Sequence, residues 1–104
     1  MGAQDLFDRS PEHQLEQIID DCLANLAGNG HGGNVVKDQY GQLSPPEAAT
    51  WTGKRFQLAL LRSGREAWLE VREFTNVGRI AGKPIRDRAD FASTVVSFAV
   101  SEAS

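Results

Sequence analysis

Residues 51–74 read WTGKRFQLALLRSGREAWLEVREF, a β-hairpin pattern in which two strands of alternating side chains flank a polar turn. The first strand is expected from Arg55 to Arg62. One of its faces carries Phe56, Leu58 and Leu60, the other carries Gln57 and Ala59, and Leu61 interrupts the alternation. Ser63 to Glu66 supply the turn, in which Gly64 can adopt a positive φ angle.

The second strand, Ala67 to Phe74, has one face that mixes aromatic rings with charges. Leu69 and Val71 share its apolar face, and the mixed face carries Trp68, Glu70, Arg72 and Phe74. Two interpretations fit the mixed face. The charges can pair with those of neighbouring strands, or the rings can stack on nucleic-acid bases while the arginines hold phosphates.

An N-terminal helix is predicted from Pro11 to about Ala27. Ser10 suits the N-cap position, and Gly28 is placed to end the helix. Three- and four-residue spacing forms one apolar face from Leu15, Ile18, Ile19, Cys22, Leu23 and Leu26. Cys22 on this face is expected to act as a small buried hydrophobic residue.

A glycine-rich loop, GNGHGGN, follows from Gly28 to Asn34. It comes after a helix and lacks a lysine behind its last glycine, which argues against a phosphate-binding loop. His31 is interpreted as a solvated loop residue. A short strand is expected within residues 34–43, and a single helical turn from Pro46 to Thr50.

The C-terminal segment permits two interpretations. Residues 75–83 form a short strand or loop, and Asp87 is a suitable N-cap for a helix from Arg88 to about Val100. The spacing of Phe91, Val95 and Phe98 fits a helical stripe. Alternating β-branched residues in the same stretch also fit a strand, but the cap favours the helix.

Length and composition indicate one domain over residues 1–104, made of an acidic helical part (1–33) and a basic β part (51–100). Residues 1–50 hold two basic and eight acidic side chains, a net charge of −6, whereas residues 51–104 hold nine basic and six acidic, a net charge of +3. This asymmetry fits either a polyanion-binding face or two halves that attract each other. The lack of a secretory signal or membrane span predicts a cytoplasmic protein without membrane contact.

No catalytic constellation is visible in the sequence. The serines lack a G-x-S-x-G setting, Cys22 is the only cysteine, and no ligand cluster surrounds His13 or His31. We therefore expect no catalytic residues, no metal, no cofactor and no enzymatic activity.

The hairpin FQLALLRSGREAWLEVREF resembles that of the transcriptional coactivator p15 family, whose second strand ends in an Asp-Ile-Arg-Glu-aromatic pattern. Residues 70–74 read Glu-Val-Arg-Glu-Phe, and Gly53-Lys54 matches a Gly-Lys pair before the first strand. Residues 82–85, GKPI, are similar to a Gly-Lys-x-Gly-Ile stretch, and Phe91 falls near the aromatic residue that opens the family's final helix. The chain departs from the family in its turn, where Ser63, Gly64 and Arg65 replace an aromatic residue and lysines.

The resemblance, over about residues 51–100, implies an α+β fold. A curved antiparallel sheet of about four strands would be followed by a C-terminal helix, with the predicted N-terminal helix in front of them. In the family, two such units form a homodimer through that helix and bind unpaired nucleic acid on their sheets.

The resulting hypothesis is a non-enzymatic module that binds single-stranded DNA or RNA, as a transcription or replication accessory protein. Its binding residues would be Lys54, Arg62, Arg65, Trp68, Arg72, Phe74, Arg79 and Lys83. The alternative is a small protein-interaction protein, an inhibitor, regulator or accessory subunit, in which Arg72 pairs with a glutamate and Trp68 lies in a core. A nucleic-acid binder should gather its arginines on one surface, whereas an interaction protein should show them scattered or paired, with an exposed apolar patch elsewhere.

Overall fold

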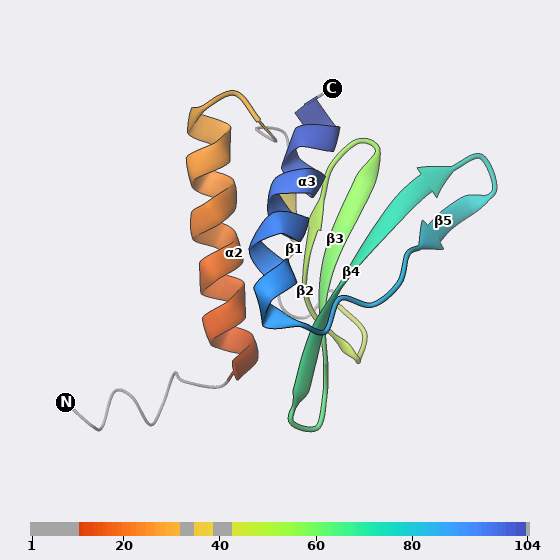
Figure 1. The fold of residues 1–104 in the computed structure, drawn as a ribbon. Helices are drawn as coiled ribbons and strands as arrows, with labels where there is room; N and C mark the ends of the chain where they lie inside the picture. The colour runs from red at the N-terminus through yellow and green to blue at the C-terminus, as the bar shows by residue number, and fades with distance from the viewer. Residues whose placement is uncertain (1–10, 32–34, 39–42, 104) are drawn as a thin grey trace.

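The computed structural model describes residues 11–31, 35–38 and 43–103, which form two α-helices and a five-stranded antiparallel sheet (Figure 1). The elements in chain order are α2 (Pro11–Gly28), β1 (Val36–Asp38), β2 (Glu47–Thr52), β3 (Phe56–Ser63), β4 (Glu66–Thr75), β5 (Gly78–Ala81), the 3₁₀ turn η1 (Arg88–Asp90) and α3 (Phe91–Ala103). The predicted α+β class, with one helix before the strands in the chain and one after them, is confirmed.

The strands pair in chain order, β1-β2-β3-β4-β5, so that each strand is hydrogen-bonded to the next. The central hairpin agrees with the sequence pattern, since Leu60 lies opposite Leu69 and Leu58 opposite Val71. The helical turn expected from Pro46 to Thr50 was wrong, because residues 47–52 form β2. About four strands were predicted and five are present; β2 is the additional strand. It is stabilised by pairing on both sides, with β1 and β3.

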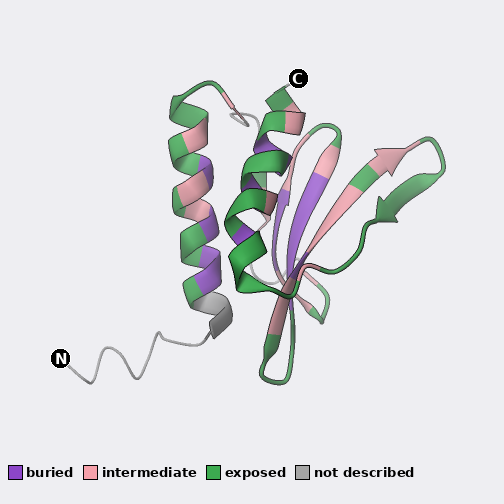
Figure 2. Cartoon of the chain, in the orientation of Figure 1, coloured by how far each residue is buried: buried purple, intermediate pink, exposed green. Residues whose placement is uncertain are grey.

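Both helices lie on one face of the sheet, as Figure 1 shows. Between them and the strands lies a single cluster of buried apolar residues from α2, β2, β3, β4 and α3: Leu15, Ile19, Leu23, Ala49, Trp51, Leu58, Leu60, Leu69, Phe91, Val95, Phe98 and Ala99. Figure 2 shows the buried residues of α2 on its side toward α3 and the sheet. The acidic helix therefore contributes to the same core as the β part.

The two helices form where the sequence places them. α2 spans the predicted range to within one residue; its proposed N-cap, Ser10, lies outside the described residues. Of the two interpretations of the C-terminal segment, the helix is correct. The Asp87 side chain accepts a hydrogen bond from the Ala89 N–H and caps η1, which leads into α3. Phe91, Val95 and Phe98 are buried on one stripe of α3, as their spacing predicts.

The β3–β4 turn consists of Gly64 and Arg65 between the paired residues Ser63 and Glu66. Gly64 has φ +61°, while no described non-glycine residue has a positive φ. A positive φ at the first turn residue alone is the signature of a type II′ turn, which matches the twist of the flanking strands. Glycine at this position therefore sets the direction in which Arg65 leaves the sheet.

The second face of the sheet carries no helix, and we call it the open face (Figure 1). It presents Thr50, Thr52, Gln57, Ala59, Leu61, Trp68, Glu70, Arg72 and Phe74. Ala59 is fully buried and Gln57 and Leu61 are nearly so, although neither described helix lies on this face. The polar side chains of the open face are therefore candidates for a functional site.

Candidate nucleic-acid interface

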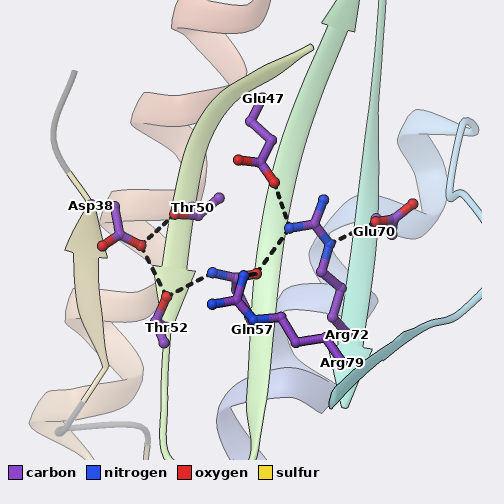
Figure 3. A network of polar contacts seen from close by, with 8 residues as sticks. All are labelled: Asp38, Glu47, Thr50, Thr52, Gln57, Glu70, Arg72 and Arg79. Atoms are coloured by element: carbon purple, nitrogen blue, oxygen red, sulfur yellow. Dashed lines mark hydrogen bonds and ion pairs between the residues drawn. The ribbon is translucent and has the colours of Figure 1, made fainter. Parts of the chain in front are cut away.

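Arg72 lies at the centre of the open face and is held by three neighbouring side chains (Figure 3). Its Nη1 donates to Glu47 Oε2 at 2.5 Å and to Gln57 Oε1 at 2.9 Å, and its Nε donates to Glu70 Oε1 at 2.7 Å. The Arg72 side chain is only 13% exposed. Burial lowers the pKa of Arg72, but the hydrogen bonds and charges of Glu70 and Glu47 outweigh burial and leave the pKa above its ordinary value. Arg72 is therefore a cation compensated by two carboxylates.

The polar network continues from Arg72 toward the β1 edge of the sheet. Gln57 Nε2 donates to Thr52 Oγ1 at 2.9 Å, and the Thr52 and Thr50 hydroxyls both donate to Asp38 Oδ2 (Figure 3). Arg79 of β5 also donates weakly to Gln57, at 3.4 Å. The network therefore connects side chains from all five strands of the sheet. The network contains three carboxylates and two guanidinium groups, so its net charge is not positive.

The two aromatic rings predicted to stack on bases already have cationic neighbours. The Arg86 guanidinium carbon lies 4.5 Å from the centroid of the Trp68 ring, and that of Arg79 lies 5.4 Å from the Phe74 ring. These are cation–π distances. Both rings are half-buried, and Trp68 lies opposite Leu61 on the open face. A base could stack on either ring only where the arginine leaves it uncovered or moves away.

A group of arginines surrounds a hollow of about 300 Å³ at the end of the sheet that carries the β3–β4 turn. The hollow is lined by Leu15, Arg65, Glu66, Ala67, Arg86 and Arg88. Arg86 Nη1 forms a 2.6 Å ion pair with Glu66 Oε2. Within the described part of the chain, the guanidinium groups of Arg65 and Arg88 have no hydrogen-bond or ion-pair partner. The described residues bring three guanidinium groups and one carboxylate to this hollow, here called the arginine hollow, and their charges sum to a positive excess.

The structure separates the predicted binding residues into four places. Arg62 and Arg65 lie at the β3–β4 end of the sheet, and Arg62 Nε donates to the Gly64 carbonyl. The open face holds Trp68, Arg72, Phe74 and Arg79. Lys54 lies in the β2–β3 turn, at the opposite end from Arg65, and Lys83 follows β5. All four places stay predictions as binding sites; Arg86 links the first two, because it lies beside Arg65 in the hollow and over the Trp68 ring on the open face.

From the sequence, Arg86 and Arg88 are expected only to add to a basic surface with Arg79 and Lys83 if these residues share a side, and no signal places them beside Arg65. They follow β5 by several residues, and the bridge between Leu69 and Ile85 carries this segment back along β4. The alternation of Arg86 and Arg88 just before a helix cap was visible in the sequence. Their approach to the β3–β4 turn required the tertiary structure.

Comparisons with known proteins assign no relatives. The sequence matches no family model, no curated protein and no solved structure. The similarity to the p15 coactivator family therefore stays a prediction that rests on the hairpin residues alone, and the arginine hollow must be interpreted from its own chemistry.

Other site chemistry is sparse within the described ranges. They contain no group of three histidine, cysteine or acidic side chains positioned to hold a metal ion. Burial raises the pKa of the Cys22 thiol, so the thiolate is disfavoured at neutral pH. His31 is half-buried rather than fully solvated. Neither described helix is both long enough and apolar enough to cross a membrane.

Proposed function

We propose that this chain is a non-enzymatic module that binds a single strand of DNA or RNA, with phosphates held in the arginine hollow. The observation that carries the proposal is the convergence of Arg65, Arg86 and Arg88 on one hollow, to which the described residues add one carboxylate, that of Glu66. Guanidinium groups suit phosphate because their planar N–H donors match its oxygens.

The open face is a weaker candidate for phosphate than the arginine hollow. Arg72 already donates to Glu47, Glu70 and Gln57, and a phosphate there would have to displace carboxylates from a partly buried network. Removing a partner from such a group costs several kcal/mol. Arg65 and Arg88, by contrast, are exposed and can contact a ligand without breaking a described interaction.

Fluorescence anisotropy with labelled 20-mer single-stranded DNA, duplex DNA and RNA tests the proposal at low and moderate salt. The Arg65→Ala/Arg88→Ala double variant should bind the single strands more weakly and reduce the slope of log K against log salt by about 1.4, or about 0.7 per lost phosphate contact. Arg79→Ala is the matched control on the open face. Its expected effect on the slope is small.

Two results would contradict this proposal. If the wild-type protein binds none of the three nucleic acids at low salt, the function is wrong. If Arg79→Ala weakens binding as much as the double variant while the melting temperature is unchanged, the strand lies across the open face instead of the arginine hollow.

A second candidate function is protein interaction, which the exposed apolar side chains favour. Val77 and Ile80 of the β4–β5 hairpin are 90% and 56% exposed, and Val96 and Val100 of α3 are 39% and 41% exposed. Self-association through α3 would cover the latter pair. Sedimentation velocity of wild type and Val96→Asp checks this, since a dimer that depends on α3 should dissociate in the variant.

A further inference from the structure

Glu102, in the last turn of α3, places its carboxylate inside the β2–β3 turn. The Lys54 N–H donates to Oε1 at 2.7 Å, the Arg55 N–H donates to Oε2 at 2.8 Å, and the Phe56 N–H donates to Oε2 as well. Three successive backbone donors thus converge on one carboxylate from an element 46 to 48 residues away in the sequence. Concave groups of successive N–H donors are a recurrent way to bind anions in proteins.

The backbone of this turn is shaped to admit the carboxylate. A Cβ atom on Gly53 would lie 2.3 Å from Glu102 Cδ and 2.5 Å from Oε1, so any side chain at this position would occupy the same space. The turn itself is closed by a hydrogen bond from the Gly53 N–H to the Phe56 carbonyl at 2.9 Å. Gly53 has no positive φ. Glycine is therefore required here because it lacks a side chain that would overlap Glu102, and not because of its backbone conformation.

The basic side chains around the turn favour the binding of an anionic ligand from solution. Lys54 and Arg55 are exposed and flank the donors, and within the described residues neither forms an ion pair. The helix dipole places negative partial charge at the C-terminus of a helix, which disfavours a glutamate in the last turn. The three N–H donors offset this unfavourable interaction of the Glu102 carboxylate. The carboxylate presents two oxygens that share one negative charge, as the two non-bridging oxygens of a phosphodiester do.

We infer that residues 53–56 form a second oxyanion site, which binds a phosphate group and which Glu102 occupies in the ligand-free protein. A phosphate oxygen pair would replace the Glu102 carboxylate on the three N–H donors, while Lys54 and Arg55 neutralise its charge. This site lies at the opposite end of the sheet from the arginine hollow and is independent of the nucleic-acid proposal. Glu102 then acts as an internal competitor that keeps the affinity for phosphate low.

The test is an NMR titration that follows the amide resonances of Lys54, Arg55 and Phe56 in wild type and Glu102→Ala. Inorganic phosphate is one probe and a thymidine dinucleotide, with a single phosphodiester, is the other; sodium chloride at equal ionic strength provides the baseline. The affinity of Glu102→Ala for at least one probe should exceed that of wild type by about tenfold or more, since a competitor bound for nine-tenths of the time masks the site by that factor. The probe that gains affinity identifies the source of the phosphate group.

Two matched variants separate this effect from a general change in charge. Glu73→Ala removes the same charge from an exposed position opposite Phe56 and should leave the affinity for both probes near the wild-type value. Gly53→Ala in the Glu102→Ala background places a Cβ in the oxyanion position and should abolish the gain. If Glu102→Ala does not fold, Glu102→Gln, which retains an acceptor but not the charge, takes its place.

The inference is overturned if the folded Glu102 variant gains no affinity for either probe. It is also overturned if Glu73→Ala gains as much as Glu102→Ala, or if Gly53→Ala leaves the gain intact. In these cases Glu102 only fastens α3 to the β2–β3 turn.

Discussion

Single residues on both faces of the sheet show how charges in this chain are compensated. Arg72 is surrounded by Glu47, Glu70 and Gln57, and Lys37 at the β1 edge forms ion pairs with Glu16 and Asp20 of α2. Both cations connect elements that are distant in sequence. They differ from Arg65 and Arg88, whose guanidinium groups have no partner among the described residues.

Arg72→Met should lower the free energy of unfolding by about 2–3 kcal/mol, because Glu47 and Glu70 would be left partly buried without a cation. Urea denaturation measures this change. Arg79→Met removes the same charge from an exposed side chain whose one hydrogen bond on this face is long, so we expect a loss of at most about 0.5 kcal/mol. Equal losses in the two variants would show that the network around Arg72 contributes no special stability.

Lys37 should make stability depend on pH at the alkaline end. Burial lowers its pKa, but hydrogen bonds and charges from Asp20 and Glu16 outweigh burial and raise the pKa above the ordinary value of 10.5. A raised pKa in the folded state means that the stabilisation is fully present below pH 10.5 and is lost as pH rises through the higher folded value. The contribution is about 1 kcal/mol, discounted because the Lys37 side chain is 35% exposed.

Melting temperatures of wild type and Lys37→Met, measured from neutral to strongly alkaline pH, check this expectation. The difference between the two proteins should be constant at neutral pH and should shrink above pH 10.5. Lys54→Met is the control, since Lys54 forms no described ion pair. A difference that instead disappears on acidification alone would assign the pH dependence to the carboxylates.

At the scale of the elements, the two candidate binding sites lie at turns between strands. The β3–β4 turn carries Arg65 at one end of the sheet, and the β2–β3 turn carries the backbone donors for Glu102 at the other. The strands between them are rigidly paired along their length. Changes in turn geometry should therefore affect binding locally, without disturbing the opposite end.

Gly64→Ala should destabilise the protein by about 1–2 kcal/mol, because an L-residue is strained at φ +61° even though no atom lies within 4 Å of the added Cβ. The same variant should weaken single-strand binding by redirecting Arg65. Gly28→Ala is the matched control: this glycine has no positive φ and also has open space around it, so alanine should be neutral or stabilising by up to about 1 kcal/mol. Thermal denaturation and anisotropy together measure both effects.

At the scale of the whole molecule, α2 and the sheet share one core although their charges are opposite. Ile19 of α2 is 1% exposed and belongs to the same cluster as Phe98 of α3 and Leu58 of β3. Ion pairs from Lys37 to Glu16 and Asp20 cross the same boundary. Lys37, Glu16 and Asp20 all belong to the acidic half of the chain, whereas the ion pair between Arg72 and Glu47 joins the basic half to the acidic half.

Ile19→Ala should lower the free energy of unfolding by about 2–5 kcal/mol while unfolding remains a single cooperative transition. Its neighbour Ile18 is 57% exposed, and Ile18→Ala should change stability by less than about 0.5 kcal/mol. Urea denaturation followed by both tryptophan fluorescence and circular dichroism tests this pair. Separate transitions for the helices and the sheet would contradict a shared core.

The sequence by itself determined the elements whose signals are local. Helical spacing and caps identified α2 and α3, and the alternation on both sides of Gly64, interrupted only at Leu61, identified the β3–β4 hairpin with its correct faces. β2 lacked such a signal, because EAATWT is short and alanine-rich and follows two prolines. Its strand conformation comes from hydrogen bonds to β1 and β3, which are tertiary partners.

Only the tertiary structure decided which charged groups meet. Arg72 and Glu47 are 25 residues apart, and Glu102 and the Lys54 amide are 48 apart. Arg86 and Arg88 approach Arg65 only because the segment after β5 returns along β4. Periodicity predicts the face of an element on which a side chain lies, but the distance between side chains on different elements depends on how those elements pack. The hairpin was therefore predictable from sequence, whereas the arginine hollow and the Glu102 contact were not.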